Sequence, residues 1–324
     1  MQTTLLGRTG VHVSALCFGT MTFGGDSDEA TSKAVFSRCM DAGINFYDSA
    51  SNYAGGRSEE ILGGLIEGHR QELVITTKFA SQSNKDLNYR SASRRSLMNT
   101  VERSLRRLRT DYIDVLFVHR ADWDTDVEET VRALDDLVKQ GKILYPAASN
   151  WPAWRIMKAL GVARQEGRTG FRVLQPMYNL LKRQAESELL PMARAEGLGV
   201  IPYSPIAGGM LSGKYAGGAK PEVGRLLTNT RYQERYADPA ITQAIEDFLA
   251  FAKERGHHPV SLAVAWVAGN PAITAPIIGA RNLEQLEDSL GSLEIEMTPE
   301  LWQELSDLTL PRPYPTDRPD DIAP

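Results

Sequence analysis

The sequence predicts an α/β fold, a single (β/α)8 barrel (TIM barrel) that spans residues 1–324. Short, continuously apolar runs alternate with amphipathic helical patterns, which is typical of a parallel sheet covered by helices. Eight such runs occur, and eight strand–helix units suit a closed barrel. The alternative is an open, doubly wound sheet, but the chain contains no G-x-G-x-x-G motif that would support a dinucleotide-binding half of that kind.

Each element can be placed on the chain. Turn residues Arg-Thr-Gly between two short β-type runs predict an N-terminal β-hairpin within residues 3–20. Apolar spacing predicts helices over residues 101–108 and 127–138, a long loop follows the seventh strand at residues 207–239, and a C-terminal helix precedes a proline-rich tail at residues 311–324. The eight strands are expected near residues 15–19, 44–47, 73–77, 113–118, 143–148, 171–175, 199–202 and 273–278.

Composition narrows the range of functions. Apolar residues make up 42% of the chain and charged residues 24%, as in ordinary globular proteins, and the net charge of −5 argues against nucleic acid as a partner. The two cysteines, Cys17 and Cys39, are too few for a disulfide framework and are expected to be buried free thiols. The sequence shows neither a signal peptide nor an apolar run of about 18 residues, so we expect a cytoplasmic protein without membrane insertion.

Polar side chains recur at the C-terminal ends of the expected strands, where barrels of this kind place their active sites. Asp48 ends the second strand, and Tyr53 lies on the loop that follows it. Lys78 ends the third strand and His119 the fourth. A single lysine after an apolar run is usually a solvated surface group, and a single histidine is usually structural. Recurrence of such residues at the same end of successive strands predicts an active site.

These four side chains predict acid–base chemistry on a carbonyl group. A tyrosine, with a pKa of about 10, is a weak acid at neutral pH. A nearby ammonium such as Lys78 stabilises the phenolate and lowers that pKa, and Asp48 can hold Lys78 in place by pairing with it. His119 can donate a hydrogen bond to the carbonyl oxygen. Such a site needs a hydride donor, and a nicotinamide is the usual one.

Eight motifs follow one another in order between about residue 3 and residue 308: FGTM, INFYDSASNYAGGRSEEILG, TTKF, DVLFVHR, SNW, QPMYN, IPYSPIAGGMLSGKY and IIGAR. Together they resemble the aldo-keto reductase superfamily, most closely its bacterial members and the related potassium-channel β subunits. The resemblance implies a (β/α)8 barrel and NADPH-dependent reduction of an aldehyde or ketone, possible in both directions. It also implies that Tyr53 is the general acid, that Lys78 and Asp48 tune it, and that His119 orients the substrate carbonyl.

The resemblance also assigns a cofactor site. Thr20 and Met21, beside Asp48, fall where the family lines the nicotinamide and ribose, and Tyr203 matches the ring that stacks on the nicotinamide. By the same resemblance, the carboxamide is held by Ser149, Asn150 and Gln175. The loop over the pyrophosphate contains Ser204, Ile206, Gly208 and Lys214, and Arg225 joins the adenosine end.

The segment after the last expected strand suits an anion. Gly279 and Arg281 precede a helix that Asn282 opens, and Gln285 completes a capping-box-like pattern. A helix N-terminus with an adjacent arginine is a good anion site, so Arg281 is the candidate for the 2′-phosphate of NADPH.

Two positions at this end depart from the family pattern. Gln285 stands where some relatives carry arginine, and Asp288 followed by Ser289 stands where Glu-Asn is common at the adenine. NADH therefore stays open as an alternative cofactor.

Other functions are weighed against this one. A redox-sensing NADP(H)-binding module with slow turnover, like a channel β subunit, is the main alternative. A metal-dependent barrel hydrolase would need clustered His and Asp ligands, and the five histidines are scattered, so no metal site is expected. Residues 208–215 lack the hydroxyl residue that a P-loop requires, because Tyr215 stands there.

The substrate and the assembly stay open. Trp123 and Trp151 lie on loops at the expected active-site face and are expected to contact a small-molecule carbonyl substrate. Sugar-derived aldehydes, pyridoxal and polycyclic ketols all remain candidates. The sequence does not decide between a monomer and a homo-oligomer.

Overall fold

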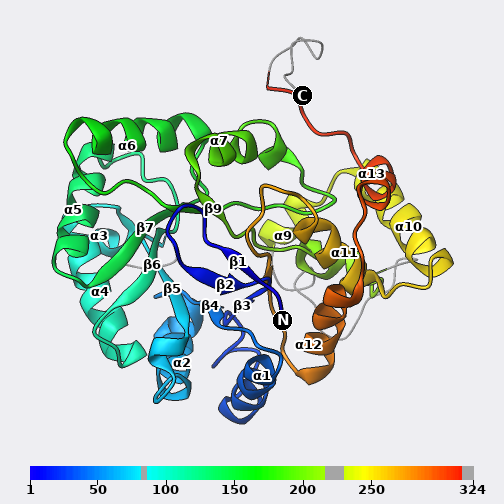
Figure 1. Cartoon of the computed structure of the whole chain (residues 1–324), viewed down its shortest axis with the longest axis horizontal. Helices are drawn as coiled ribbons and strands as arrows, with labels where there is room; N and C mark the ends of the chain where they lie inside the picture. Colours follow the sequence, from blue (N-terminus) through cyan, green and yellow to red (C-terminus); the bar gives the residue numbers. More distant parts are fainter. Residues whose placement is uncertain (82–85, 216–229, 316–324) are drawn as a thin grey trace.

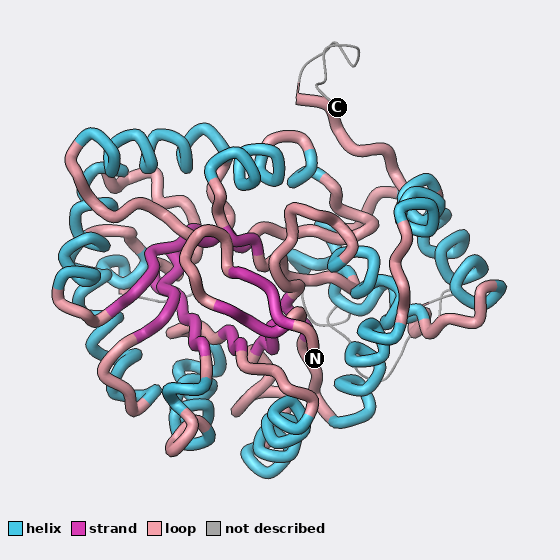
Figure 2. The backbone as a smooth tube through the Cα atoms, viewed as in Figure 1, coloured by secondary structure: helices cyan, strands magenta, loops and turns pink. Residues whose placement is uncertain are grey.

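The structure is a computed structural model that describes residues 1–81, 86–215 and 230–315. At its centre lies a curled parallel sheet of eight strands surrounded by helices (Figures 1 and 2). This arrangement fits an α/β TIM-barrel-like fold, as the alternating strand and helix patterns predict. The strands are β3 (Cys17–Gly19), β4 (Phe46–Asp48), β5 (Val74–Phe79), β6 (Ile113–Val118), β7 (Ile143–Ser149), β8 (Val173–Gln175), β9 (Gly199–Val200) and β10 (Ile277–Ile278).

The expected strands agree with these bounds to within a few residues, and the last one differs most. Residues 273–278 are expected as a strand, but only Ile277 and Ile278 pair with β3. Pro276 precedes them and has no amide N–H to donate, which limits the regular ladder.

One seam joins the two ends of the sheet. Strands follow chain order except that β10, the last, pairs with β3, the first. On the other side of β10, the amide of Thr274 donates to the carbonyl of Val200 at 2.8 Å, and the amide of Ile277 donates to the carbonyl of Pro202 at 2.9 Å. The segment around β10 therefore forms backbone hydrogen bonds with both edges of the sheet.

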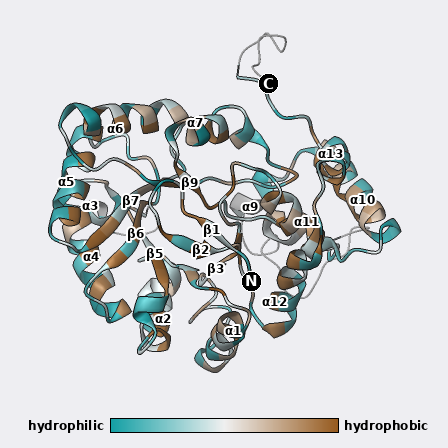
Figure 3. Ribbon diagram, viewed as in Figure 1, coloured by the Kyte–Doolittle hydropathy of each residue, from teal (hydrophilic) through white to brown (hydrophobic). Residues whose placement is uncertain are grey.

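The helices cover the outside of the sheet and bury their apolar faces against it. In α5, for example, Val127, Val131 and Leu134 are buried. Figure 3 shows hydrophobic colouring on the central strands and mixed colouring on the helices around them. The helices of eight or more residues are α1 (Glu29–Asp41), α2 (Arg57–Leu65), α4 (Arg94–Leu108), α5 (Val127–Lys139), α6 (Ala153–Gln165), α7 (Leu189–Glu196), α10 (Pro239–Glu254), α11 (Pro259–Ala268), α12 (Leu283–Leu290) and α13 (Pro299–Asp307), and the shorter ones are α3 (Leu87–Arg90) and α9 (Thr230–Arg235).

A short hairpin lies over one end of the sheet (Figure 1). Strand β1 (Thr3–Leu5) pairs with β2 (His12–Ser14) in antiparallel fashion. Leu6 and Val13 are fully buried and belong to the same apolar cluster as the inward-facing strand residues. The amide of Arg8 donates to the carbonyl of Gly197 at 3.0 Å, just before β9. The hairpin therefore covers the N-terminal ends of the strands, and the C-terminal ends face the other way.

Side chains alternate between the inside of the sheet and the helices, as strand geometry requires. In β6, Val115 and Phe117 belong to the inner apolar cluster, whereas Leu116 and Val118 belong to the outer cluster that the helices cover. Continuing the alternation by one residue turns His119 inward. Cys17 and Cys39 are buried free thiols, which confirms that expectation. Within the described residues, no helix is both long and apolar enough to cross a membrane.

Candidate active site

The inward-facing residue at the C-terminal end of each of several strands contributes to one polar cluster. Asp48 is the last residue of β4, and Lys78 is the last inward-facing residue of β5. His119 directly follows β6, and Gln175 ends β8. Parallel strands bring these ends to the same edge of the sheet, so residues far apart in the chain converge there.

A buried ion pair lies at the base of the cluster. The Lys78 Nζ lies 2.5 Å from Oδ2 of Asp48, and the lysine is fully buried. The other carboxylate oxygen accepts hydrogen bonds from the Thr76 hydroxyl at 2.6 Å and from Nε2 of Gln175 at 2.9 Å. Burial by itself lowers the pKa of Lys78. The charge of Asp48 and the hydrogen bonds of Lys78 with Asp48 and Tyr53 outweigh that effect, so the pKa of Lys78 is raised. Lys78 is therefore a permanent cation at working pH.

Tyr53 lies in front of this pair. The Lys78 Nζ lies 3.3 Å from the Tyr53 hydroxyl and also donates to the backbone carbonyl of Ser49 at 2.6 Å. Its charge lies 4.9 Å from the centre of the tyrosine ring. The rings of Tyr53 and His119 meet edge to face, with centroids 6.2 Å apart. One cation thus faces the phenol oxygen, and one imidazole stands beside it.

His119 is held uncharged. Burial, and then the positive charges of Lys78 and Arg120, lower the pKa of His119 to about 3. The imidazole is consequently neutral at any ordinary assay pH. Its Nδ1 is buried and has no hydrogen-bond partner in the part of the chain that the structure describes. A buried ring nitrogen of this kind is suited to the polar atom of a ligand.

Amide and hydroxyl groups extend the site past the ion pair. The Asn150 side chain donates to the Ser149 hydroxyl at 2.8 Å and accepts from the Tyr203 hydroxyl at 2.7 Å. Ser149 in turn donates to the backbone carbonyl of Gln175 at 2.9 Å. Asn150 adopts a φ of 58°, in the left-handed region that asparagine tolerates better than most residues. This network fixes the side chains that the sequence assigns to the nicotinamide end.

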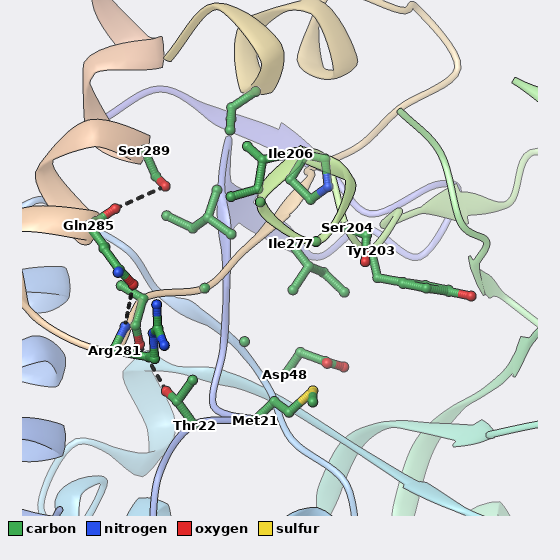
Figure 4. A pocket seen from close by; sticks show the side chains of 18 of the residues that line it. Met21, Thr22, Asp48, Tyr203, Ser204, Ile206, Ile277, Arg281, Gln285 and Ser289 are labelled. Carbon is green, nitrogen blue, oxygen red and sulfur yellow. Dashed lines mark hydrogen bonds between the residues drawn. The ribbon is translucent and has the colours of Figure 1, made fainter. Parts of the chain in front are cut away.

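The opposite end lies at the N-terminus of α12 (Figure 4). Asn282 caps the helix and accepts from the amide of Gln285 at 3.0 Å, as the capping pattern predicts. The Gln285 side chain turns back and accepts from the amide of Arg281 at 3.1 Å. The Thr22 hydroxyl donates to the carbonyl of Ala280 at 2.8 Å, which ties the loop after β3 to this turn.

A cavity of about 720 Å³ joins the two ends. In Figure 4, Arg281 and Gln285 lie at one side of it and Tyr203 at the other, with Asp48, Met21 and Ile277 between them. The cavity brings together most of the residues that the sequence singles out: Met21, Asp48, Tyr53, His119, Ser149, Asn150, Gln175, Tyr203, Ser204, Ile206, Gly208, Lys214, Gly279, Arg281, Gln285 and Asp288.

Four of the assigned residues do not line this cavity. Lys78 lies behind Tyr53 and Asp48. Thr20 is buried beneath the site, where its hydroxyl contacts the Ser58 hydroxyl and the backbone carbonyl of Asp48, and its contact with the nicotinamide stays a prediction. Trp151 is 3% exposed and packs edge to face on Phe171 in the core, and its contact with the substrate stays a prediction.

The fourth is Trp123, which is 66% exposed and packs beside Trp154 outside the cavity lining. Arg225, expected near the adenosine, lies outside the described residues, as does much of the long loop over residues 207–239.

The cavity also contains residues that sequence reasoning missed. Several lie on loops after strands or on α11, which packs against α12. Short-range sequence patterns carried no signal for them, because they line the site through helix and loop packing rather than at a strand end. They include Thr22, Asp26, Ser81, Arg120, Arg235, His258, Val260 and Val264.

The donor set suits a nicotinamide dinucleotide. Primary amides and hydroxyls are gathered at one end, where a carboxamide would need donors and acceptors. Arg281 lines the cavity just before the N-terminus of α12, and Lys214 lines the cavity as well, so that positive charge is available for phosphates. Among the described residues, no cluster of three or more His, Cys, Asp or Glu side chains is placed to hold a metal ion.

Comparisons with known proteins show which family the chain is similar to. The family model described as "Aldo/keto reductase family" matches residues 15–309. The chain is 37% identical over 323 residues to an uncharacterized oxidoreductase, YrpG, of Bacillus subtilis (strain 168), which covers 95% of this chain and 96% of that protein. It is 36% identical over 333 residues to a probable voltage-gated potassium channel subunit beta of Oryza sativa subsp. japonica, with 98% and 99% covered. A protein of the same description from Arabidopsis thaliana is 36% identical over 307 residues, with 91% and 92% covered.

The fold and these relatives define an NAD(P)H-dependent oxidoreductase. The chain belongs to the aldo/keto reductase family.

Proposed function

We propose that this protein is an NADPH-dependent aldo-keto reductase that reduces an aldehyde or ketone to the alcohol, with Tyr53 as the proton donor. The observation that carries the proposal is the continuous contact from Asp48 through Lys78 to the Tyr53 hydroxyl at the mouth of the strand ends. A nicotinamide bound in this cavity supplies hydride to the carbonyl carbon.

The chain's own residues would handle the proton and the developing negative charge. Tyr53 would transfer its hydroxyl proton to the carbonyl oxygen. Lys78, held by Asp48 and the Ser49 carbonyl, would stabilise the tyrosine oxygen after the proton has left. Neutral His119 would donate a hydrogen bond to the same carbonyl oxygen and so fix its direction. In the reverse direction, the same tyrosine would accept the proton of an alcohol.

The proposed cofactor contacts follow the cavity. Ser149, Asn150 and Gln175 would hold the carboxamide, and Tyr203 would offer its ring to the nicotinamide. Arg281, at the start of α12, would receive the 2′-phosphate, so NADPH is preferred to NADH. The remaining proposed contacts are Met21, Ser204, Ile206, Gly208, Lys214, Arg225, Gly279, Gln285 and Asp288.

The proposal also covers the domain organisation and one substrate contact. Residues 1–324 would form one domain, because the first and last strands pair directly. Trp123, exposed on the loop after β6, stays the candidate for contact with a small-molecule substrate that extends beyond the cavity.

A second candidate function has a specific observation in its favour, since two of the relatives are named as probable potassium channel β subunits. This candidate is a redox-sensing NADP(H)-binding module with slow turnover that reports the cofactor state to a partner protein.

One experiment separates the two candidates. Fluorescence titration with NADPH and with NADH gives the two dissociation constants, and absorbance at the nicotinamide band then follows oxidation of bound NADPH by a panel of aldehydes and ketones. Tight NADPH binding with many turnovers on some carbonyl would support the reductase. Tight binding with one slow turnover across the panel would support the sensor, and failure to bind either nucleotide would overturn both.

A further inference from the structure

A second polar cluster lies behind the site, on the side of the sheet that the helices cover. Thr77 neighbours Lys78 in β5 but points outward, because successive strand side chains alternate. Its hydroxyl donates to Oε1 of Glu59 at 2.7 Å. Glu59 lies in the first turn of α2 and is fully buried. The Arg107 side chain of α4 reaches the other carboxylate oxygen, with Nη1 3.2 Å from Oε2.

Arg107 continues past this carboxylate to the loop that carries Tyr53. Its Nη1 donates to the carbonyl of Ser51 at 3.0 Å, and its Nη2 forms a longer contact with the carbonyl of Gly55 at 3.5 Å. These two carbonyls lie on either side of Tyr53 in the chain. The arginine side chain is only 17% exposed, so water competes weakly for these charge-assisted hydrogen bonds.

The loop needs such an external support. Ala54, directly after Tyr53, has a φ of 46° and a ψ of 39°, and Gly55 follows with a φ of 68°. Residues other than glycine rarely occupy the left-handed region, because Cβ comes close to the backbone there. Gly56 follows with a φ of 103°, and three consecutive residues with positive φ give a tight turn that the local sequence alone stabilises poorly.

The two helices leave room for the arginine. A Cβ added to Gly56 would lie 2.2 Å from the guanidinium carbon of Arg107. A Cβ added to Gly63 would lie 2.2 Å from the backbone oxygen of Arg107, so α2 and α4 could not approach so closely. Any larger residue at either position would displace Arg107 from the Tyr53 loop.

We infer that Arg107 is a positioning residue that holds the Tyr53 hydroxyl opposite Lys78. Its guanidinium fixes the loop from Ser51 to Gly55, and its partner Glu59 is bonded to Thr77, the residue before Lys78. The cluster therefore connects the strand that carries the cation with the loop that carries the phenol. This inference rests on the proposed role of Tyr53 as proton donor.

The test compares Arg107→Met with Arg106→Met, since Arg106 is exposed on the same helix. Steady-state kinetics with a carbonyl substrate gives kcat, and NADPH fluorescence titration gives the cofactor Kd. Displacement of a catalytic group by about 1 Å can cost a factor of about 10². We therefore expect kcat of Arg107→Met to fall about 10- to 100-fold while its cofactor Kd changes by less than about twofold. Arg106→Met should keep the wild-type values of both.

Removing Arg107 alone leaves the buried Glu59 carboxylate without its cation, and that variant risks misfolding. The double variant Glu59→Gln/Arg107→Met removes both charges, and Glu59→Gln alone serves as its control. A fall in kcat in the double variant beyond that of Glu59→Gln, at unchanged cofactor Kd, supports the inference. Wild-type kcat in either variant that lacks Arg107 overturns it.

A double-mutant cycle with Tyr53→Phe distinguishes this inference from the proposed function. If Arg107 acts through the Tyr53 hydroxyl, Arg107→Met should cause no further loss in residual turnover once that hydroxyl is gone. A full additional loss in the Tyr53→Phe background would overturn the inference and leave the reductase mechanism standing. Wild-type kcat in Tyr53→Phe would instead overturn the proposed role of Tyr53, whatever Arg107 does.

Discussion

The ammonium of Lys78 and the carboxylate of Asp48 are 2.5 Å apart, and both side chains are almost completely removed from solvent. A pair in this environment depends on both partners, because taking an isolated charge out of water is costly. The same cation lies 3.3 Å from the Tyr53 hydroxyl, so the ion pair also determines the electrostatic environment of the phenol oxygen.

Breaking this pair should destabilise the fold. Asp48→Asn leaves the Lys78 ammonium buried without its counter-charge, and we expect a loss of about 3–5 kcal/mol in the free energy of unfolding. Lys78→Met should cost a similar amount by leaving the carboxylate alone. The double variant Asp48→Asn/Lys78→Met should cost clearly less than the sum of the two. Urea denaturation of the four proteins at pH 7 measures this coupling, and strictly additive losses would contradict it.

Removal of the Tyr53 hydroxyl should abolish most turnover. General acid catalysis contributes about 10²- to 10⁴-fold, so kcat of Tyr53→Phe should fall by that order. The ring remains in place, so the Kd for NADPH should change little. Steady-state kinetics measures the fall in kcat, and fluorescence titration measures the Kd for NADPH. Replacement of the exposed Tyr314 by Phe is the matched control and should leave both values unchanged.

His119 should make the protein less stable in acid. Its pKa in the folded state is about 3, because burial and neighbouring cations disfavour the imidazolium, whereas an unfolded histidine has a pKa of about 6.5. Between these values the unfolded chain binds a proton at this residue that the folded chain does not. The free energy of unfolding therefore falls as the pH drops from about 6.5 toward 3, by at most about 1.4 kcal/mol per pH unit from this group.

His119→Asn should reduce that slope, and chemical denaturation at a series of pH values between 6.5 and 4 measures it. His69→Asn is the control, since His69 is 51% exposed. Equal slopes for wild type and His119→Asn would mean that the imidazole is not held neutral.

Arg281 should set the preference for NADPH. A hydrogen bond between charged groups contributes about 1.5–3 kcal/mol, and partial exposure places this one near the lower end. Arg281→Ala should therefore raise the Kd for NADPH about tenfold and leave that for NADH within about twofold. Titration of both nucleotides measures this, with Arg132→Ala on the distant α5 as control. Equal weakening of both nucleotides would place the 2′-phosphate elsewhere.

The polar cluster at the strand ends was largely predictable because strand geometry is simple. Apolar runs mark the strands, and alternation with a period of two turns the residue at each strand end inward, as for Asp48, Lys78 and His119. The parallel order of the strands then collects these residues at one edge. A single sequence contains all of this information locally.

Other parts of the site depend on packing between distant segments, which local patterns do not encode. Trp151 is an aromatic residue on a loop at the active-site face, which is typical of a substrate contact. In the structure it does not line the cavity and packs on Phe171 in the core. His258 and Val264 reach the cavity because α11 packs against α12, where the Ser261 hydroxyl donates to the carbonyl of Asp288. Arg107 is one of several arginines in an amphipathic helix, and only the structure distinguishes it from its exposed neighbour Arg106.

The pairing of β10 with β3 has a consequence for the order in which the site is completed. Asp48, Tyr53 and Lys78 leave the ribosome early, whereas Arg281 emerges about two hundred residues later. The residues proposed to handle the proton are thus synthesised well before the residue proposed to receive the phosphate. A dinucleotide that spans both parts of the site would bind only the finished chain. Once bound, it would join the earliest and the latest strands and protect the closing strand from local unfolding.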